Sequence, residues 1–219
     1  MRKIVLFQGD SITDASRMRE VRGSLGIGYA NYVAGELGMD APYQYKFYNR
    51  GISGNRIVDL YARIKFSFIN LKPDYLSILI GVNDVWHEYT SQNGVSAEKF
   101  EFIYSLLIEE IRQALPDIKI MILEPFVLQG EKTRTTEEAP GRWEHFSSEV
   151  PLRAQAAKRI ADKYGLLFVP LQEAFDEAER SEPADGYWLL DGVHPSPAGH
   201  DLIKRQWLKA FAQLTAQEK

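Results

Sequence analysis

Short runs of apolar and β-branched residues recur along the chain, and most of them are separated by segments long enough for a helix. The runs lie at 3–7, 43–48, 75–80, 118–123 and 166–169. Three segments place apolar residues at helical spacing: Ile57, Leu60, Tyr61 and Ile64; Phe102, Leu106, Ile108 and Ile111; and Leu202, Ile203, Leu208 and Phe211. Strands that alternate with such helices predict a parallel sheet covered on both faces. Ligands of such a sheet bind beyond the carboxyl ends of its strands.

The chain shows no internal repeat, low-complexity tract or linker that would divide it, so we expect a single domain over residues 1–219. One segment stands out. Residues 126–146 are polar, rich in Glu, Thr and Arg, and longer than an ordinary connection. This pattern indicates a surface excursion and suggests the hypothesis of a lid.

Composition narrows the classes of function. The 219 residues are 45% hydrophobic, which suffices to bury roughly 70% of the surface of the unfolded chain. A net charge of -4 without blocks of like charge predicts neither a nucleic-acid partner nor a membrane partner and fits a neutral or polar small molecule. The absence of cysteine excludes thiolate catalysis and cysteine-ligated metals. The short apolar run at 4–7 predicts no signal peptide, hence a cytoplasmic protein, and homo-oligomer formation stays open.

The first candidate for chemistry is Ser11, which follows the first predicted strand in the stretch Gly9-Asp10-Ser11. A tight turn from strand to helix would hold the serine hydroxyl above the sheet, where it can react. The alternative is that Asp10 or Ser11 only caps the next helix. Either role needs the same local turn.

Two further candidates follow the second and third predicted strands. Residues 51–54 read Gly-Ile-Ser-Gly, which is typical of a turn with outward backbone amides. Asn83 offers an amide donor to an oxygen that develops negative charge, although an Asn-Asp pair also caps helices. Both lie where a parallel sheet would bring them near Ser11.

The last candidate is a carboxylate and an imidazole three residues apart, Asp191 and His194. The aspartate would accept a hydrogen bond from one ring nitrogen while the other nitrogen takes a serine proton. A surface hydrogen-bonded pair is the alternative. The other histidines, His87, His145 and His200, have no such local carboxylate, and His200 is expected to be structural in the last helix.

Four blocks, "GDSITD", "GISGN", "GVND" and "DGVHPS", resemble in order the signature blocks of GDSL-type, or SGNH, hydrolases. The resemblance implies a flavodoxin-like three-layer α/β/α sandwich with a central parallel sheet of about five strands. It also implies serine-dependent ester hydrolysis without a metal or cofactor. Ile12 stands where the family has its name-giving leucine, a change of apolar shape that leaves the chemistry unaffected.

Roles for individual residues carry over from the matching blocks. The resemblance implies a catalytic triad of Ser11, Asp191 and His194. It implies an oxyanion hole made by the backbone N–H groups of Ser11 and Gly54 and by the side chain of Asn83.

The longer matches "NRGISGN" and "GVNDVW" are most similar to bacterial acetyl esterases of decorated plant polysaccharides. They imply removal of acetyl groups from plant-derived saccharides such as xylo-oligosaccharides. Trp86 and Trp188, beside the Asn83 and Asp191 loops, are candidate walls for a sugar or its acyl group, or are simply partly buried. Asp10 is a third candidate substrate contact.

Four other functions remain alternatives. A lipid esterase or lysophospholipase and a thioesterase would share the fold. A metal-dependent phosphoesterase would gather Asp10, Asn83, Asp84, Asp191 and His194 around two ions. A carbohydrate-binding module without activity would use the loop aromatics.

Overall fold

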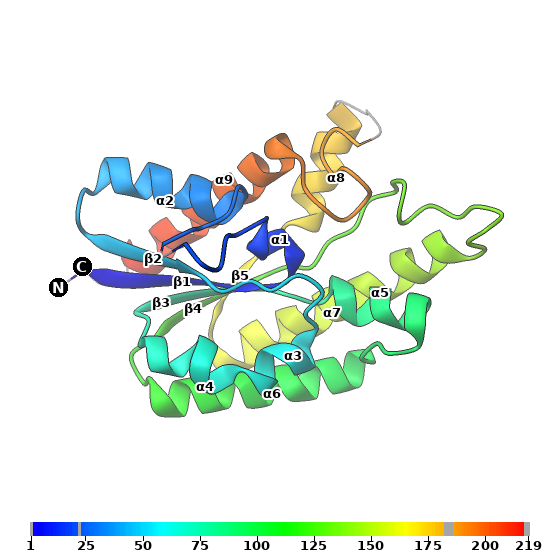
Figure 1. The fold of residues 1–219 in the computed structure, drawn as a ribbon. Helices are drawn as coiled ribbons and strands as arrows, with labels where there is room; N and C mark the ends of the chain where they lie inside the picture. The colour runs from blue at the N-terminus through cyan, green and yellow to red at the C-terminus, as the bar shows by residue number, and fades with distance from the viewer. Residues whose placement is uncertain (1, 22, 182–185, 217–219) are drawn as a thin grey trace.

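A five-stranded parallel sheet forms the centre of the protein (Figure 1). The computed structural model describes residues 2–21, 23–181 and 186–216. The strands are β1 (Lys3–Gly9), β2 (Tyr45–Asn49), β3 (Tyr75–Leu79), β4 (Lys119–Leu123) and β5 (Leu167–Val169), in the order β2-β1-β3-β4-β5. This is the flavodoxin-like order, and each strand overlaps one predicted run. The predicted fold class is confirmed.

Helices cover both faces of the sheet (Figure 1). One layer contains α2 (Tyr29–Asp40), α8 (Gln172–Ser181) and α9 (Pro197–Ala216). The opposite layer contains α3 (Ile57–Ala62), α4 (Ile64–Ser67), α6 (Ala97–Ala114) and α7 (Arg142–Tyr164). The short α1 (Ser11–Asp14) follows β1, the 3-10 helix η1 (Ile69–Leu71) follows α4, and α5 (Val82–Ser91) follows β3.

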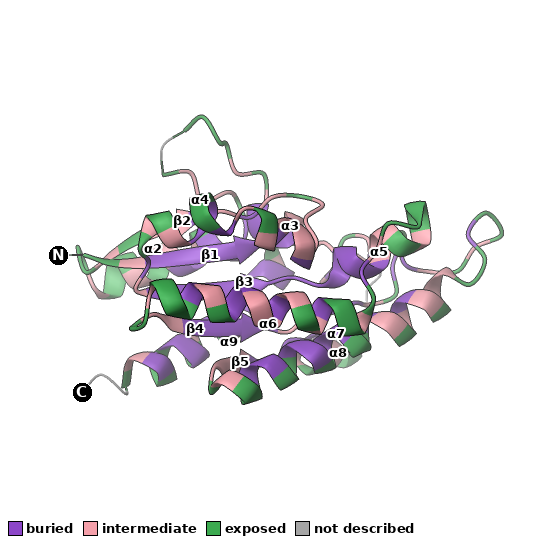
Figure 2. Ribbon diagram, turned by 90° about the horizontal axis from the view of Figure 1, so that it is seen from below, coloured by how far each residue is buried: buried purple, intermediate pink, exposed green. Residues whose placement is uncertain are grey.

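The central strands β1, β3 and β4 are buried on both faces, and their side chains contribute to two separate cores (Figure 2). In β1, Val5 and Phe7 join the core under α2 and α9, whereas Leu6 joins the core under α3 and α6. Burial on two sides explains why the strands read as continuous apolar runs rather than as alternating patterns. Trp207 of α9 is fully buried in the first core.

Two of the predicted helical faces need correction. In α6 the side chain of Phe102 is 64% exposed, and Phe100, Tyr104 and Leu107 are buried instead. Apolar residues surround much of this helix, so their spacing fits more than one face. The segment 57–64 is not one helix, because it breaks at Arg63 between α3 and α4.

None of the helices in the described ranges is both long and apolar enough to cross a membrane. The cytoplasmic location and the homo-oligomer stay predictions from the sequence.

Candidate active site

Ser11 is the first residue of α1, directly beyond the carboxyl end of β1. Asp10 caps this helix, because its Oδ1 accepts the backbone N–H of Ile12 at 3.0 Å. The cap role expected at this turn therefore falls to Asp10, and the chemical role of Ser11 stays a prediction.

The side chain of Ser11 meets the loop before α9. Its Oγ lies 2.9 Å from Nε2 of His194, and Nδ1 of the same ring lies 2.7 Å from Oδ2 of Asp191. The second carboxylate oxygen of Asp191 accepts the backbone N–H groups of Val193 and His194, at 3.0 and 2.8 Å. The structure thus brings the three predicted triad residues into one hydrogen-bonded chain, with the aspartate fixed by the backbone.

The two charged members of this chain favour each other's ionised form. The hydrogen bond to Asp191 raises the pKa of His194 above its usual value, against the opposing effect of partial burial. Burial opposes ionisation of Asp191, but the hydrogen bonds from the His194 ring and from the backbone N–H groups outweigh it and lower the pKa of Asp191. Near neutral pH, Asp191 is therefore a carboxylate that stabilises a proton on the imidazole.

The segment predicted as an excursion supports the triad loop. The backbone N–H of Leu128 donates to Gly192 O, and that of Lys132 donates to Asp191 O, each at 2.9 Å. Gly192 has a φ of 99°, and a Cβ there would lie 2.2 Å from Oγ1 of Thr133, so only glycine fits. The cavity beside Ser11 has no lining residue from 126–146. The segment thus braces the loop that carries Asp191, and its last part is the start of α7.

Besides the N–H of Ser11, the predicted oxyanion donors are Gly54, in the loop after β2, and Asn83, at the start of α5. Gly54 has a φ of 80°, in the left-handed region that glycine adopts without steric cost. Nδ2 of Asn83 donates to the carbonyl oxygen of Asn55 at 3.2 Å. This bond uses one amide hydrogen and holds Asn83 against the loop that carries Gly54.

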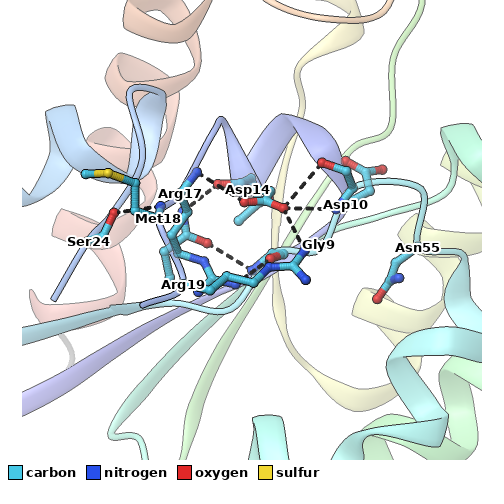
Figure 3. Close-up of polar contacts among 12 residues, drawn as sticks. Gly9, Asp10, Asp14, Arg17, Met18, Arg19, Ser24 and Asn55 are labelled. Atoms are coloured by element: carbon cyan, nitrogen blue, oxygen red, sulfur yellow. Dashed lines mark hydrogen bonds and ion pairs between the residues drawn. The ribbon is translucent and has the colours of Figure 1, made fainter. Parts of the chain in front are cut away.

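A carboxylate that the sequence reasoning missed, Asp14, connects the Ser11 helix to this loop (Figure 3). Its side chain is 5% exposed, and Oδ2 accepts the backbone N–H of Ser53 at 3.1 Å and Nη2 of Arg19 at 3.4 Å. Arg17 adds a bond from Nη2 to Gly51 O at 3.0 Å. The only signal in the sequence is that Asp14 ends the first signature block.

Arg63 connects β1 to the same loop and was also missed. Its guanidinium donates to Gln8 Oε1 at 2.8 Å, to Gly9 O at 3.3 Å and to Asn55 Oδ1 at 2.9 Å. Burial, with repulsion from Arg17, lowers the pKa of Arg63 to about 10, so the group stays charged near neutral pH. These contacts hold the Arg63 side chain against β1 and the loop after β2, at the residue where the predicted helix breaks.

The three predicted substrate contacts have different surroundings. The Trp86 ring lies 6.0 Å from the His194 ring, beside the triad. Trp188 instead lines a separate cavity with Leu202 and Arg205 of α9. Asp10 is 1% exposed, and burial raises the pKa of its carboxyl group to about 7. The prediction that Asp10 contacts substrate is therefore wrong, because its side chain faces inward.

A cavity of about 300 Å³ opens beside Ser11 and His194. Most of its wall is apolar, and its further lining residues are Ile12, Ala15, Ser16, Ile27, Ser53, Leu190, Pro195, Pro197 and His200. In the part of the chain that the structure describes, no group of three or more His, Asp or Glu residues is placed to hold a metal ion. The geometry thus offers a hydroxyl, an imidazole and amide donors at a small pocket.

A three-layer α/β/α fold with a Ser-His-Asp chain beyond the carboxyl ends of its strands defines the class of serine hydrolases. Residues 7–202 match the model of the GDSL-like Lipase/Acylhydrolase family, and the chain belongs to this family.

Three of the proteins and structures that this chain is similar to match it over nearly its whole length. An acetylxylan esterase from Geobacillus stearothermophilus is 36% identical over 94% of this chain and 92% of its own length. The crystal structure of that organism's acetylxylan esterase Axe2 gives a TM-score of 0.80 at 34% identity, covering 95% of this chain and 93% of the other. The crystal structure of a Parabacteroides merdae protein, described as a GDSL-like lipase, gives a TM-score of 0.87 at 35% identity, with 97% of both chains covered. Other structures of Axe2 carry alanine in place of a serine or a histidine and are described as catalytic mutants.

Proposed function

We propose that this protein removes acetyl groups from saccharides of the xylan type, with Ser11 as nucleophile, His194 as base and Asp191 as its partner. The observation that carries the proposal is the continuous hydrogen-bonded chain from Ser11 Oγ through His194 to Asp191. The similarity to acetylxylan esterases supports the choice of substrate.

The first half of the reaction forms an acetyl-enzyme. Ser11 Oγ attacks the carbonyl carbon of the ester while Nε2 of His194 takes the hydroxyl proton. Asp191 holds the Nδ1–H and stabilises the imidazolium. The negative oxygen of the tetrahedral intermediate accepts hydrogen bonds from the N–H groups of Ser11 and Gly54 and from the Asn83 amide.

The intermediate collapses when His194 returns the proton to the leaving oxygen of the sugar, which departs as an alcohol. A water molecule then attacks the acetyl-serine, with His194 taking its proton. The second tetrahedral intermediate releases acetate, and the proton returns to Ser11. The cycle consumes one water and one ester and needs no further co-reactant.

The test compares two substrate series. Acetate release from acetylated xylo-oligosaccharides is measured beside kcat/KM for acetyl, butyryl and octanoyl esters of one leaving group, with Ser11→Ala as the inactive control. We expect saccharide deacetylation and a fall in kcat/KM with chain length. A lipid esterase would instead gain about 0.8 kcal/mol for each CH₂ it buries. A steady rise with chain length and no saccharide deacetylation would replace this proposal with the lipid-esterase alternative.

A further inference from the structure

His200 accepts a backbone hydrogen bond, and this bond determines which nitrogen of its ring carries the proton. It lies in the first turn of α9, and its Nδ1 accepts the backbone N–H of Tyr29 at 3.2 Å. Tyr29 is the first residue of α2, whose own cap position is Gly28 and provides no side-chain acceptor. The imidazole from α9 therefore supplies the cap that α2 lacks.

This contact fixes the position of the ring proton. A nitrogen that accepts a hydrogen bond carries no hydrogen, so the proton of the neutral ring is on Nε2. Burial, with the charge of His194 acting in the same direction, lowers the pKa of His200 to about 4. The partial positive charge at the start of α2 also disfavours an imidazolium. Near neutral pH, His200 is a neutral N–H donor and not a second base.

His200 also belongs to the wall of the cavity beside Ser11. His200 lines the same cavity as Ser11 and His194, and Nε2 is on the ring edge opposite the atom that bonds Tyr29. Within the described residues, Nε2 makes no hydrogen bond to the protein. The ring packs closely against Gly28, because a Cβ at that position would lie 2.7 Å from the Cε1 of His200. Most of the neighbouring wall, including Ile12 and Pro197, is apolar.

We propose that His200 is a specificity-determining residue whose Nε2–H donates to an oxygen of the saccharide held in this cavity. The inference rests on the proposed function and deepens it. A sugar offers hydroxyl and ring oxygens as acceptors, whereas an alkyl chain in the same place would bury the N–H without a partner. An unpartnered buried donor is costly, so the residue favours saccharide esters over lipid esters.

Two variants separate this role from the structural one. In His200→Asn, the side-chain oxygen reaches the position of Nδ1 and keeps an acceptor for Tyr29, but nothing occupies the position of Nε2. In His200→Gln, the longer amide places an N–H near the Nε2 position, but the acceptor for Tyr29 is lost. Each is assayed on acetylated xylo-oligosaccharides and on ethyl acetate, with thermal unfolding of each protein as a measure of folding.

We expect His200→Asn to lose about 5- to 10-fold in kcat/KM on the saccharide, as for one hydrogen bond between neutral groups, and less than about 2-fold on ethyl acetate. His200→Gln should keep the preference for saccharide while unfolding at a lower temperature. A merely structural histidine would give the reverse: an unaffected Asn variant and an impaired Gln variant. That reversal, or an equal loss on both substrates, would overturn the inference.

A second measurement does not depend on how these variants fold. In Ser11→Ala labelled with ¹⁵N-histidine, the His200 Nε2–H resonance should be present at neutral pH and should shift on addition of acetylated xylotriose. A resonance that stays unchanged at saturating saccharide would overturn the inference. Wild-type enzyme that releases no acetate from saccharides would instead contradict the proposed function itself, so the two failures are distinguishable.

Discussion

Replacing Asp191 with asparagine exchanges one oxygen for an amide nitrogen, and the surrounding hydrogen bonds determine how the amide turns. Oδ1 accepts two backbone N–H groups, from Val193 and His194, while Oδ2, among the residues that the structure describes, bonds the His194 ring alone. An asparagine at this position keeps its carbonyl oxygen toward the two backbone N–H groups. In the opposite orientation the amide N–H groups would face these two backbone donors, and no hydrogen bond could form. Its amide nitrogen therefore faces Nδ1 of His194.

The substitution therefore leaves the His194 ring in the tautomer that cannot act as a base. Nδ1 must now accept a hydrogen bond, so the ring proton moves to Nε2, the atom 2.9 Å from Ser11 Oγ. This nitrogen then has no lone pair for the serine proton. The same exchange in serine proteases lowers kcat about 10⁴-fold. We expect a loss of that order in Asp191→Asn, which corresponds to about 5.4 kcal/mol in activation free energy.

The assay measures kcat for a soluble acetyl ester from pH 5 to 9. In the wild type, kcat/KM should rise as His194 loses its proton, with a midpoint above the ordinary histidine value because Asp191 raises the pKa of His194. Asp162→Asn, which changes an exposed carboxylate paired with Lys158 on α7, is the matched control and should behave as wild type. Circular dichroism reports the fold. A folded Asp191→Asn enzyme that retains more than about a tenth of kcat would refute the tautomer reasoning.

Three other predictions follow from the site. Asn83→Ala should lower kcat about 10²-fold or more with little change in KM, because the amide acts on charge that develops in the transition state; a change confined to KM would contradict this role. Asp14→Ala should lower both kcat and the free energy of unfolding, the latter by about 1–3 kcal/mol in urea titrations, because the N–H of Ser53 loses its acceptor; unchanged values would show that the bond to Ser53 does not hold the loop. Burial raises the pKa of Asp10 to about 7 from 3.8, so the folded state holds a proton that the unfolded state has lost, and stability falls between about pH 4 and 7. Asp10→Asn should remove this decrease, and an identical pH slope in both proteins would be evidence against it.

The sheet and the proximity of Ser11, His194 and Asp191 could be predicted from the sequence because their signals are local. The central strands are runs of apolar residues buried on both sides, and strands alternate with helices along the chain. Asp191 and His194 lie three residues apart on one loop, so their pairing needs no knowledge of the fold. Ser11 follows the first strand at the edge where a parallel sheet gathers its functional loops.

The supporting residues could not be predicted because their partners are distant in the chain. Asp14 bonds Ser53, 39 positions away, and Arg63 bonds Gln8, 55 positions away. His200 receives its hydrogen bond from Tyr29, 171 positions away. No spacing or propensity encodes such contacts. The sequence therefore could not show that His200 bonds Tyr29 through Nδ1 and leaves Nε2 for the role proposed above.

Trapping the acetyl-enzyme tests the central claim most directly. The enzyme is mixed with excess acetylated xylotriose, quenched in acid within one turnover, digested and mapped by mass spectrometry, with Ser11→Ala treated in parallel. We predict a mass gain of one acetyl group on the peptide that contains Ser11, located on that serine and absent from the variant. An acetyl group on another residue, or rapid release of acetate by the Ser11→Ala protein, would contradict the account.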